Sequence, residues 1–449
     1  MRTIGRVGTR ARNVLLLGAL AAFVWSSTPA THAFCDPGTG CGPSPHTDDL
    51  WWLPSSSGVW SSDSNWALHT LGSGFSGHPT NPTPSPPPNG TNFYGYYLHF
   101  GYATGATNTN STDDIASLQV NGLDFGGGTN TLTIQSGKSL TVVRTESSVV
   151  PSSYIQVAAG GSTYIDVEGV LSANLTNPNV GADIGVNSGG VFNVNSNMSI
   201  GSIQGDSTGS VNLNANLTVG TTNLSTTFSG GINGTGSLTK VGIGTLQLNG
   251  NSGYSGTTTV NAGTLLVNSV PGGSATGSGD VTVNSGATIG GTGNVGNLTV
   301  NFGATMAPGN SAGVFSVAGQ LSLAGTLAIQ LGGTQQGQFD QVVVGFGATL
   351  SSPTLSLSLV NGFTPTFGQQ FVIVQNNSPT SFGAPLFPIT GSFSNGSTVV
   401  DDQGNSYAIT ILPTAIFLTD ITPVPEPATW LLLGVGAAGS VVGRLRRRR

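Results

Sequence analysis

The chain of 449 residues is poor in charge and rich in glycine: charged residues make up 7% of it, and 69 residues are glycine. Nine of its 12 Lys and Arg residues lie at the two ends, so the part between them carries three positive charges against 18 acids, a formal charge of −15. An acidic surface repels phosphate groups, which excludes nucleic acid and anionic lipid as partners of the folded part.

The first 33 residues have the pattern of a secretory signal peptide. A basic segment from Arg2 to Arg12 precedes an apolar stretch from Val14 to Trp25, which is too short to span a bilayer comfortably. Thr31-His32-Ala33 then provides a context of small residues for cleavage. We therefore expect an N-terminal signal helix that is removed after Ala33 when the protein is exported.

Residues 34–129 are predicted to form an N-terminal cap region that contains a Pro-rich loop at residues 78–90. Cys35 and Cys41, the two cysteines of the chain, can close a small disulfide loop in an oxidising compartment. Four tryptophans of this region suit either a plug for the end of the repeat domain or a platform for sugars: Trp51, Trp52, Trp60 and Trp66.

Residues 130–350 repeat a short motif, a valine followed three residues later by glycine. The clear copies begin at Val157, Val186, Val260, Val283, Val300 and Val344, and weaker copies begin at Ile134, Ser207, Ile232 and Leu323. Their starts average about 23 residues apart, a period that is typical of solenoid proteins.

Residues within a copy alternate between apolar and polar. Val211 and Leu213 point to one side of the predicted strand, and Asn212 and Asn214 to the other. The glycine after each strand allows a corner. We therefore predict an all-β protein, a right-handed parallel β-helix over residues 130–350 in which the six valines stack inward. A β-sandwich is the alternative fold, because it also has short strands at regular spacing.

Three segments resemble parts of secreted passenger domains. Gly234–Leu246, continued by Tyr254-Ser255-Gly256 and Val260–Leu265, resembles the autotransporter-associated β-strand repeat. Ala307–Gly313 and Phe339–Val342 are similar to the segment that follows this repeat in such proteins. Gly58–Ser61 with Asn65-Trp66 resembles the motif that opens these domains. The resemblance implies a continuous β-helix.

Residues 351–422 keep the alternation of a strand, as in Leu355, Leu357 and Leu359, but lose the glycine corners. We predict that they form a C-terminal β cap. Such a cap protects the open end of a β-helix against edge-to-edge aggregation.

Residues 423–449 form a tail with three parts in order: Pro425-Glu426-Pro427, an apolar run from Leu431 to Val442, and an arginine cluster from Arg444 to Arg449. This tail resembles the PEP-CTERM sorting signal of Gram-negative bacteria. The resemblance implies that an exosortase, a membrane enzyme, cuts near the Pro-Glu-Pro motif and passes the protein towards the cell surface or extracellular matrix.

The length of the tail suits a transient membrane helix. As a helix, residues 428–442 reach about 22 Å, which is short of the roughly 30 Å hydrocarbon core. The arginines hold the C-terminus in the cytoplasm by the positive-inside rule. A permanent, short membrane anchor is the alternative.

Candidate catalytic groups are sparse in the repeats. All five histidines lie at or before His99, and no cysteine follows Cys41, so the usual general base and thiol nucleophile are missing there. Asp166 and Glu168 share one strand face, but the next coil is expected to bring Asn195 and Asn197 beside them. We expect a solvated strand face, no catalytic residue, no metal site and no cofactor.

Two further acid pairs leave a surface Ca²⁺ open as a lesser alternative. Asp113-Asp114 and Asp401-Asp402 each occur among polar residues that are typical of loops.

The sequence therefore predicts an exported structural or adhesive protein of the cell surface or extracellular matrix and not an enzyme. Its partners are expected to be the exosortase, the inner membrane in transit, and extracellular polysaccharide or neighbouring surfaces. The alternative is a secreted β-helix enzyme that degrades polysaccharide, which requires acids and bases that converge on adjacent coils.

Overall fold

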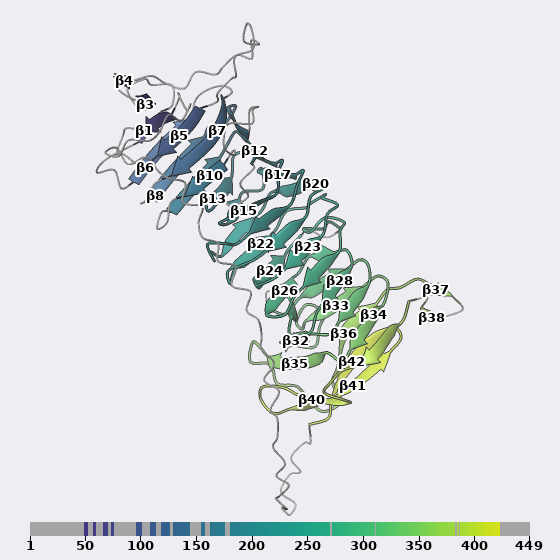
Figure 1. Ribbon diagram of the computed structural model, residues 1–449. Coiled ribbons are helices and arrows are strands. Elements are labelled where there is room, and N and C mark those ends of the chain that lie inside the picture. The colour runs from purple at the N-terminus through teal and green to yellow at the C-terminus, as the bar shows by residue number, and fades with distance from the viewer. Residues whose placement is uncertain are drawn as a thin grey trace, which may run out of the picture. The chain divides into compact units, whose positions relative to one another are not determined.

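The computed structural model describes residues 49–52, 57–59, 66–70, 73–75, 96–100, 108–113, 118–125, 129–143, 154–157, 162–175 and 180–422, the last range without 270–271, 310, 382–383 and 386. All described elements are strands, which form three long sheets, a seven-stranded sheet and a small hairpin (Figure 1). The predicted signal helix and tail helix lie outside the described residues.

Sheet 1 runs through the whole described stack and is parallel throughout. Its 13 strands, in order, are β2 (Ser57–Val59), β6 (Asn108–Asp113), β8 (Thr129–Ile134), β11 (Ser162–Val167), β13 (Asp183–Val186), β16 (Ile203–Gly205), β19 (Thr226–Phe228), β22 (Thr245–Leu248), β24 (Gly263–Val267), β26 (Ala287–Gly291), β29 (Thr305–Pro308), β32 (Thr326–Leu331) and β35 (Thr354–Leu359).

Sheet 3 has nine parallel strands. They are β15 (Met198–Ile200), β18 (Leu217–Val219), β21 (Leu238–Lys240), β23 (Thr258–Val260), β25 (Val281–Val283), β28 (Leu298–Val300), β31 (Leu321–Leu323), β34 (Ala348–Ser351) and β39 (Ile389–Ser392).

The third face is divided between two sheets. Sheet 2 covers the N-terminal half with β4 (Ser73–Phe75), β3 (Trp66–Thr70), β1 (Asp49–Trp52), β5 (Tyr96–Phe100), β7 (Leu118–Phe125), β9 (Ser139–Val143), β10 (Tyr154–Val157), β12 (Val170–Asn174), β14 (Val191–Val194), β17 (Ser210–Leu213) and β20 (Gly231–Gly234). Sheet 4 covers the C-terminal half with β27 (Asn294–Val295), β30 (Val314–Val317), β33 (Gln341–Val344), β36 (Gln370–Asn376), β42 (Ala415–Asp420), β41 (Ser406–Leu412) and β40 (Thr398–Val400).

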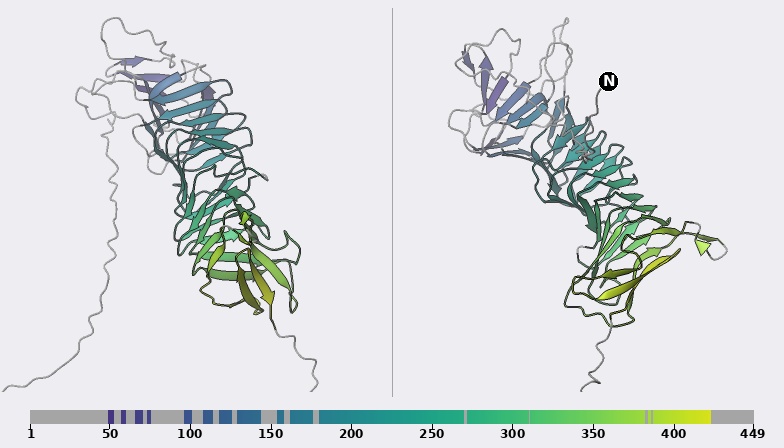
Figure 2. Two further views of the ribbon diagram at one scale, coloured as in Figure 1. Left: turned by 90° about the vertical axis from the view of Figure 1, so that its right-hand side faces the viewer. Right: turned by 60° about the horizontal axis from the view of Figure 1, so that its bottom comes forward.

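Successive coils stack on one another along the chain (Figure 2). Not every coil has a strand in each sheet, because β21 to β26 belong to sheets 1 and 3 only. The offset between paired residues in sheet 1 is 17 residues from Ile289 to Met306 and 28 residues from Leu327 to Leu355. These parallel ladders are those of a β-helix and contradict the antiparallel β-sandwich alternative.

The N-terminal end of the stack begins before residue 130. β6 already pairs in parallel with both β2 and β8, and β5 pairs in parallel with β1 and β7. β3 and β4 then close sheet 2 with antiparallel pairs. A change from parallel to antiparallel pairing therefore marks this end.

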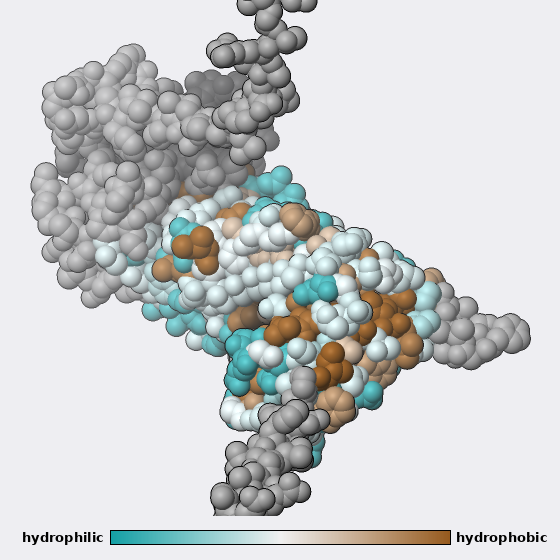
Figure 3. Space-filling view, turned by 90° about the horizontal axis from the view of Figure 1, so that it is seen from below, coloured by the Kyte–Doolittle hydropathy of each residue, from teal (hydrophilic) through white to brown (hydrophobic). Residues whose placement is uncertain are grey.

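The C-terminal end closes in the same way. β36 pairs in parallel with β33 but antiparallel with β42, and β41 and β40 follow antiparallel, while β37 (Thr380–Ser381) and β38 (Ala384–Pro385) form a separate hairpin. Asn395 binds the edge strand β35 like a further strand, because its side chain accepts from Leu355 N at 2.7 Å and donates to Leu355 O at 3.1 Å. Seen from below, this end shows hydrophobic patches among polar residues (Figure 3).

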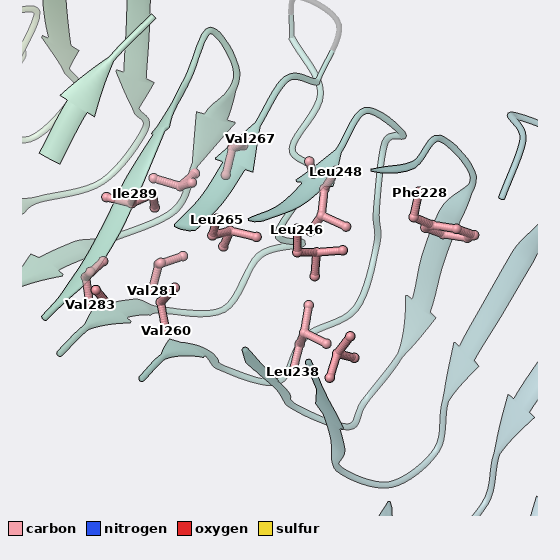
Figure 4. Close-up of a cluster of buried hydrophobic side chains, with 14 of the residues drawn as sticks. Phe228, Leu238, Leu246, Leu248, Val260, Leu265, Val267, Val281, Val283 and Ile289 are labelled. Carbon is pink, nitrogen blue, oxygen red and sulfur yellow. The ribbon is translucent and has the colours of Figure 1, made fainter. Parts of the chain in front are cut away.

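The core consists of inward side chains of successive coils, as predicted from the alternation (Figure 4). Phe228, Leu246, Leu265 and Ile289 are all buried on neighbouring strands of sheet 1. Leu246, Leu265 and Ile289 are register partners, and Phe228 pairs with Leu248, so these strands bury apolar surface away from water from coil to coil.

The prediction that six valines stack together is only partly correct. The five whose side chains are described are buried, but only Val260, Val283 and Val300 are direct neighbours in one sheet. Val186 lies in sheet 1 and Val344 in sheet 4. The motif marks the last inward residue before a glycine corner with positive φ, and such corners follow strands of every sheet.

Candidate functional site

Several predicted site residues lie outside the described residues: Ala33, Cys35, Cys41, Trp60, Pro425, Glu426 and Pro427. The backbone places the other three tryptophans close together, since β1 holds Trp51 and Trp52, and β3 holds Trp66. Trp52 is the register partner of Trp66 in the antiparallel pair. These residues thus lie in the terminal strands of sheet 2.

Among the described residues, the structure does not bring a third acid to Asp166 and Glu168. Asp166 is flanked in its sheet by Thr133 and Gly185, and its Oδ1 accepts a hydrogen bond of 2.9 Å from Asn187 Nδ2. The expectation that Asn195 and Asn197 lie beside this pair is wrong. They belong to the corner before sheet 3, where Asn214 Nδ2 donates to Asn195 Oδ1 at 2.7 Å.

The described acids of the two pairs considered for Ca²⁺ are buried or make hydrogen bonds within the protein. Asp113 does not lie in a surface loop, because it is the last residue of β6 and is fully buried. Asp114 lies outside the described residues.

At the other end, Asp401 accepts hydrogen bonds from the backbone of Gln403 and Asn405 and from the side chains of Asn405 and Tyr407, each at 2.9 Å. Burial alone would raise the pKa of Asp401, but these bonds outweigh it and lower the pKa. Asp402 accepts from Leu359 N of the edge strand at 2.9 Å. Both acids therefore hold the C-terminal strands and loops together through hydrogen bonds. Within the described residues, no three His, Cys, Asp or Glu side chains come together as a metal site.

Lys240 is a buried cation among the inward residues of sheet 3, with 1% of its surface exposed. Its register partners are Val219 and Val260. The ammonium donates to three backbone carbonyls, Val241 O at 2.6 Å, Gly242 O at 2.8 Å and Ala262 O at 3.3 Å. Burial lowers the pKa of this ammonium. Lys240 therefore joins the corners of two successive coils.

We expect Lys240→Ala to lower the free energy of unfolding by about 1–3 kcal/mol, because it leaves buried carbonyls without a donor. Lys240→Met fills a similar volume but has no donor. It is therefore expected to lose less stability than Lys240→Ala, because it keeps the packing of the side chain. Thr239→Ala is the control, because the outward neighbour should change stability by no more than about 0.5 kcal/mol. Urea unfolding of the three variants measures the differences. Wild-type stability of Lys240→Ala would contradict the role of Lys240 in joining the corners.

Asp340 joins the two downstream segments that were noted in the sequence. Its side chain is completely buried and accepts hydrogen bonds from Gly313 N at 2.9 Å and Gln330 N at 2.8 Å. Burial raises its pKa to about 7, although both backbone donors act to lower it. Gly309 has a φ of +83°, and a side chain there would approach Asp340 Oδ1 to 2.7 Å, so glycine is required.

The outward face of sheet 3 carries one hydroxyl residue on the middle of each strand. We call this set the hydroxyl column, and register pairs join each member to the next: Ser199, Thr218, Thr239, Thr259, Thr282, Thr299, Ser322, Thr349 and Thr390. Its spacing is that of neighbouring strands, about 4.7–4.9 Å. The alternation predicted polar outward residues, but the column could not be recognised without the register.

Corner amides form a second ladder beside the hydroxyl column. Asn284 Nδ2 donates to Asn261 Oδ1 at 2.7 Å, and Asn301 Nδ2 donates to Asn284 Oδ1 at 2.9 Å. These asparagines bond from coil to coil. The result is a neutral, regularly spaced surface of hydroxyl and amide groups, which suits recognition of hydrogen-bonding, uncharged partners.

Comparison with protein families identifies two segments. Residues 238–267 match the passenger-associated-transport-repeat, and residues 423–448 match the PEP-CTERM protein-sorting motif. No curated protein matches the chain. The sorting motif implies exosortase-dependent export to the cell surface or extracellular space, as the resemblance of the tail predicted.

The matched repeat corresponds to β21 through β24, which include Lys240 and the corner glycines Gly242 and Gly263. The repeat thus coincides with the coils that Lys240 joins. Among the described residues, no helix has the length and apolar character needed to cross a membrane.

Proposed function

We propose that this chain is a structural or adhesive protein of the cell surface or extracellular matrix, and not an enzyme. In this proposal the β-helix presents the uncharged outward face of sheet 3 to its surroundings, and the hydroxyl column is the observation that carries the proposal. Nine hydroxyl residues in register form an extended contact surface for extracellular polysaccharide or a neighbouring surface.

Export requires both ends of the chain. The signal peptide is removed after Ala33, the tail holds the protein briefly in the inner membrane, and the exosortase cuts near Pro425-Glu426-Pro427. The match of residues 423–448 to the sorting motif supports the last step. A polysaccharide-degrading enzyme is the less favoured function, because Asp166 and Glu168 lack a convergent acid or base among the described residues.

Both chain ends of the surface-exposed protein test this export route. Labelling of intact cells with a membrane-impermeant reagent, followed by mass spectrometry, is expected to give protein that begins at Phe34 and lacks Arg444–Arg449. Material at the surface that retains Met1, or that carries the complete C-terminus, would contradict the proposed processing.

A further inference from the structure

A groove of about 450 Å³ opens on the outside of sheet 3 near its C-terminal end. The last four members of the hydroxyl column line it: Thr299, Ser322, Thr349 and Thr390. The last three are exposed, and no hydrogen bond joins these four hydroxyls to the described part of the protein. Their donors and acceptors therefore face the space of the groove.

Two aromatic rings border the same groove. Phe346 and Phe387 form an edge-to-face pair with ring centroids 5.6 Å apart, yet 44% and 41% of their surfaces remain exposed. The backbone of Phe387 makes two hydrogen bonds: its N–H donates to Ser378 Oγ at 3.1 Å, and its carbonyl accepts from Asn376 Nδ2 at 2.8 Å. These bonds and the contact between the two rings position the aromatic side of the groove.

Amide and carboxylate groups complete the lining. Asn297 Nδ2 donates to Asp280 Oδ1 at 2.8 Å, and Gln320 N donates to Asn297 Oδ1 at 2.9 Å. Asp280 is the one charged residue of the lining, and no Lys or Arg is present in it. An anionic ligand therefore finds no counter-charge here, whereas a neutral ligand rich in hydroxyls finds partners on every coil.

We propose that this groove binds a linear, neutral, β-linked polysaccharide that lies along the stack of coils. The flat faces of its sugars pack on Phe346 and Phe387, and its hydroxyl groups bond to the hydroxyl column. Because coils repeat every 4.7–4.9 Å or so, and an extended β-linked chain advances by a similar distance per sugar, successive sugars meet equivalent groups. The inference deepens the adhesive function proposed above by naming its partner.

Affinity electrophoresis of the purified full chain tests the groove, with mixed-linkage β-glucan in the gel as the neutral probe and alginate as the acidic one. Phe346→Ala is expected to weaken β-glucan binding about tenfold or more. Thr349→Val, which replaces a hydroxyl by a methyl group, is expected to weaken it several-fold. Phe302→Ala is the matched control, because Phe302 is 84% exposed at a corner outside the groove and its loss should leave binding unchanged.

Three results would overturn the inference. They are no retardation by β-glucan, stronger retardation by alginate than by β-glucan, and equal weakening by Phe346→Ala and Phe302→Ala. Far-ultraviolet circular dichroism of each variant verifies its fold. The binding assay is independent of export. If a correctly displayed protein does not bind β-glucan, only the proposed site is refuted. Binding by a protein that never reaches the surface refutes the proposed function alone.

Discussion

Replacement of Pro425, Glu426 and Pro427 by alanine is expected to abolish surface display and to leave the full-length chain in the inner membrane. The match of residues 423–448 to the sorting motif assigns recognition to this segment. Without the motif the exosortase has no site to cut, so the tail remains attached. The loss should be nearly complete, since the proposed cleavage is the step that would separate the protein from its apolar tail.

The physical character of the tail explains where uncut protein should remain. As a helix, residues 428–442 reach about 22 Å, so the run is long enough to enter the roughly 30 Å hydrocarbon core but too short to cross it well. The six residues from Arg444 to Arg449 include five arginines, which oppose export of the terminus. Deletion of this cluster alone should let the tail slip through and release uncut protein.

Cell fractionation and immunoblotting measure both variants. Replacement of Pro86, Pro87 and Pro88 by alanine, which changes three residues of the Pro-rich segment outside the matched motif, is the matched control and should be displayed normally. If the alanine triplet variant still reaches the surface at the wild-type level, the tail does not act through this motif.

Much of the fold was predictable because each coil of a β-helix repeats the same sequence features, which are alternating apolar residues and glycine corners. Alternation identified inward residues such as Val211 and Leu213, and both are buried. Glycine corners identified the strand ends, as positive φ at Gly263 and Gly286 confirms. The sheet to which each strand belongs was not predictable, because the same corner chemistry follows strands of all sheets.

The residues that sequence reasoning missed depend on register. Lys240 occupies the place of a valine, and only the pairing of β21 with β18 and β23 reveals that it is buried. The sequence held one indication of this burial: in Leu238-Thr239-Lys240 the lysine stands where the preceding coil has valine, in Leu217-Thr218-Val219. Asp113 was expected in a loop for a similar reason, because composition alone does not separate a polar strand end from a turn.

Asp340 is expected to make the protein less stable as the pH rises from 4 to 7. Its pKa is about 7 in the folded protein, against about 3.9 in an unfolded chain. Between these values the folded state keeps a proton that the unfolded state has lost, so its stabilising contribution is complete below pH 4 and is lost as the pH passes 7. The difference corresponds to a change on the order of 4 kcal/mol in the free energy of unfolding.

Urea unfolding of the purified protein at pH values from 3 to 8 measures this slope. Asp340→Asn cannot titrate and is expected to flatten the decline between pH 4 and 7. Asp206→Asn is the matched control: hydrogen bonds, first from Ser188 N, lower the pKa of Asp206 to about 2, so its contribution is lost only as the pH falls below about 4. Asp206→Asn should therefore keep the decline above pH 4. An unchanged decline in Asp340→Asn would show that Asp340 titrates at an ordinary pKa, and that its two backbone donors offset its burial.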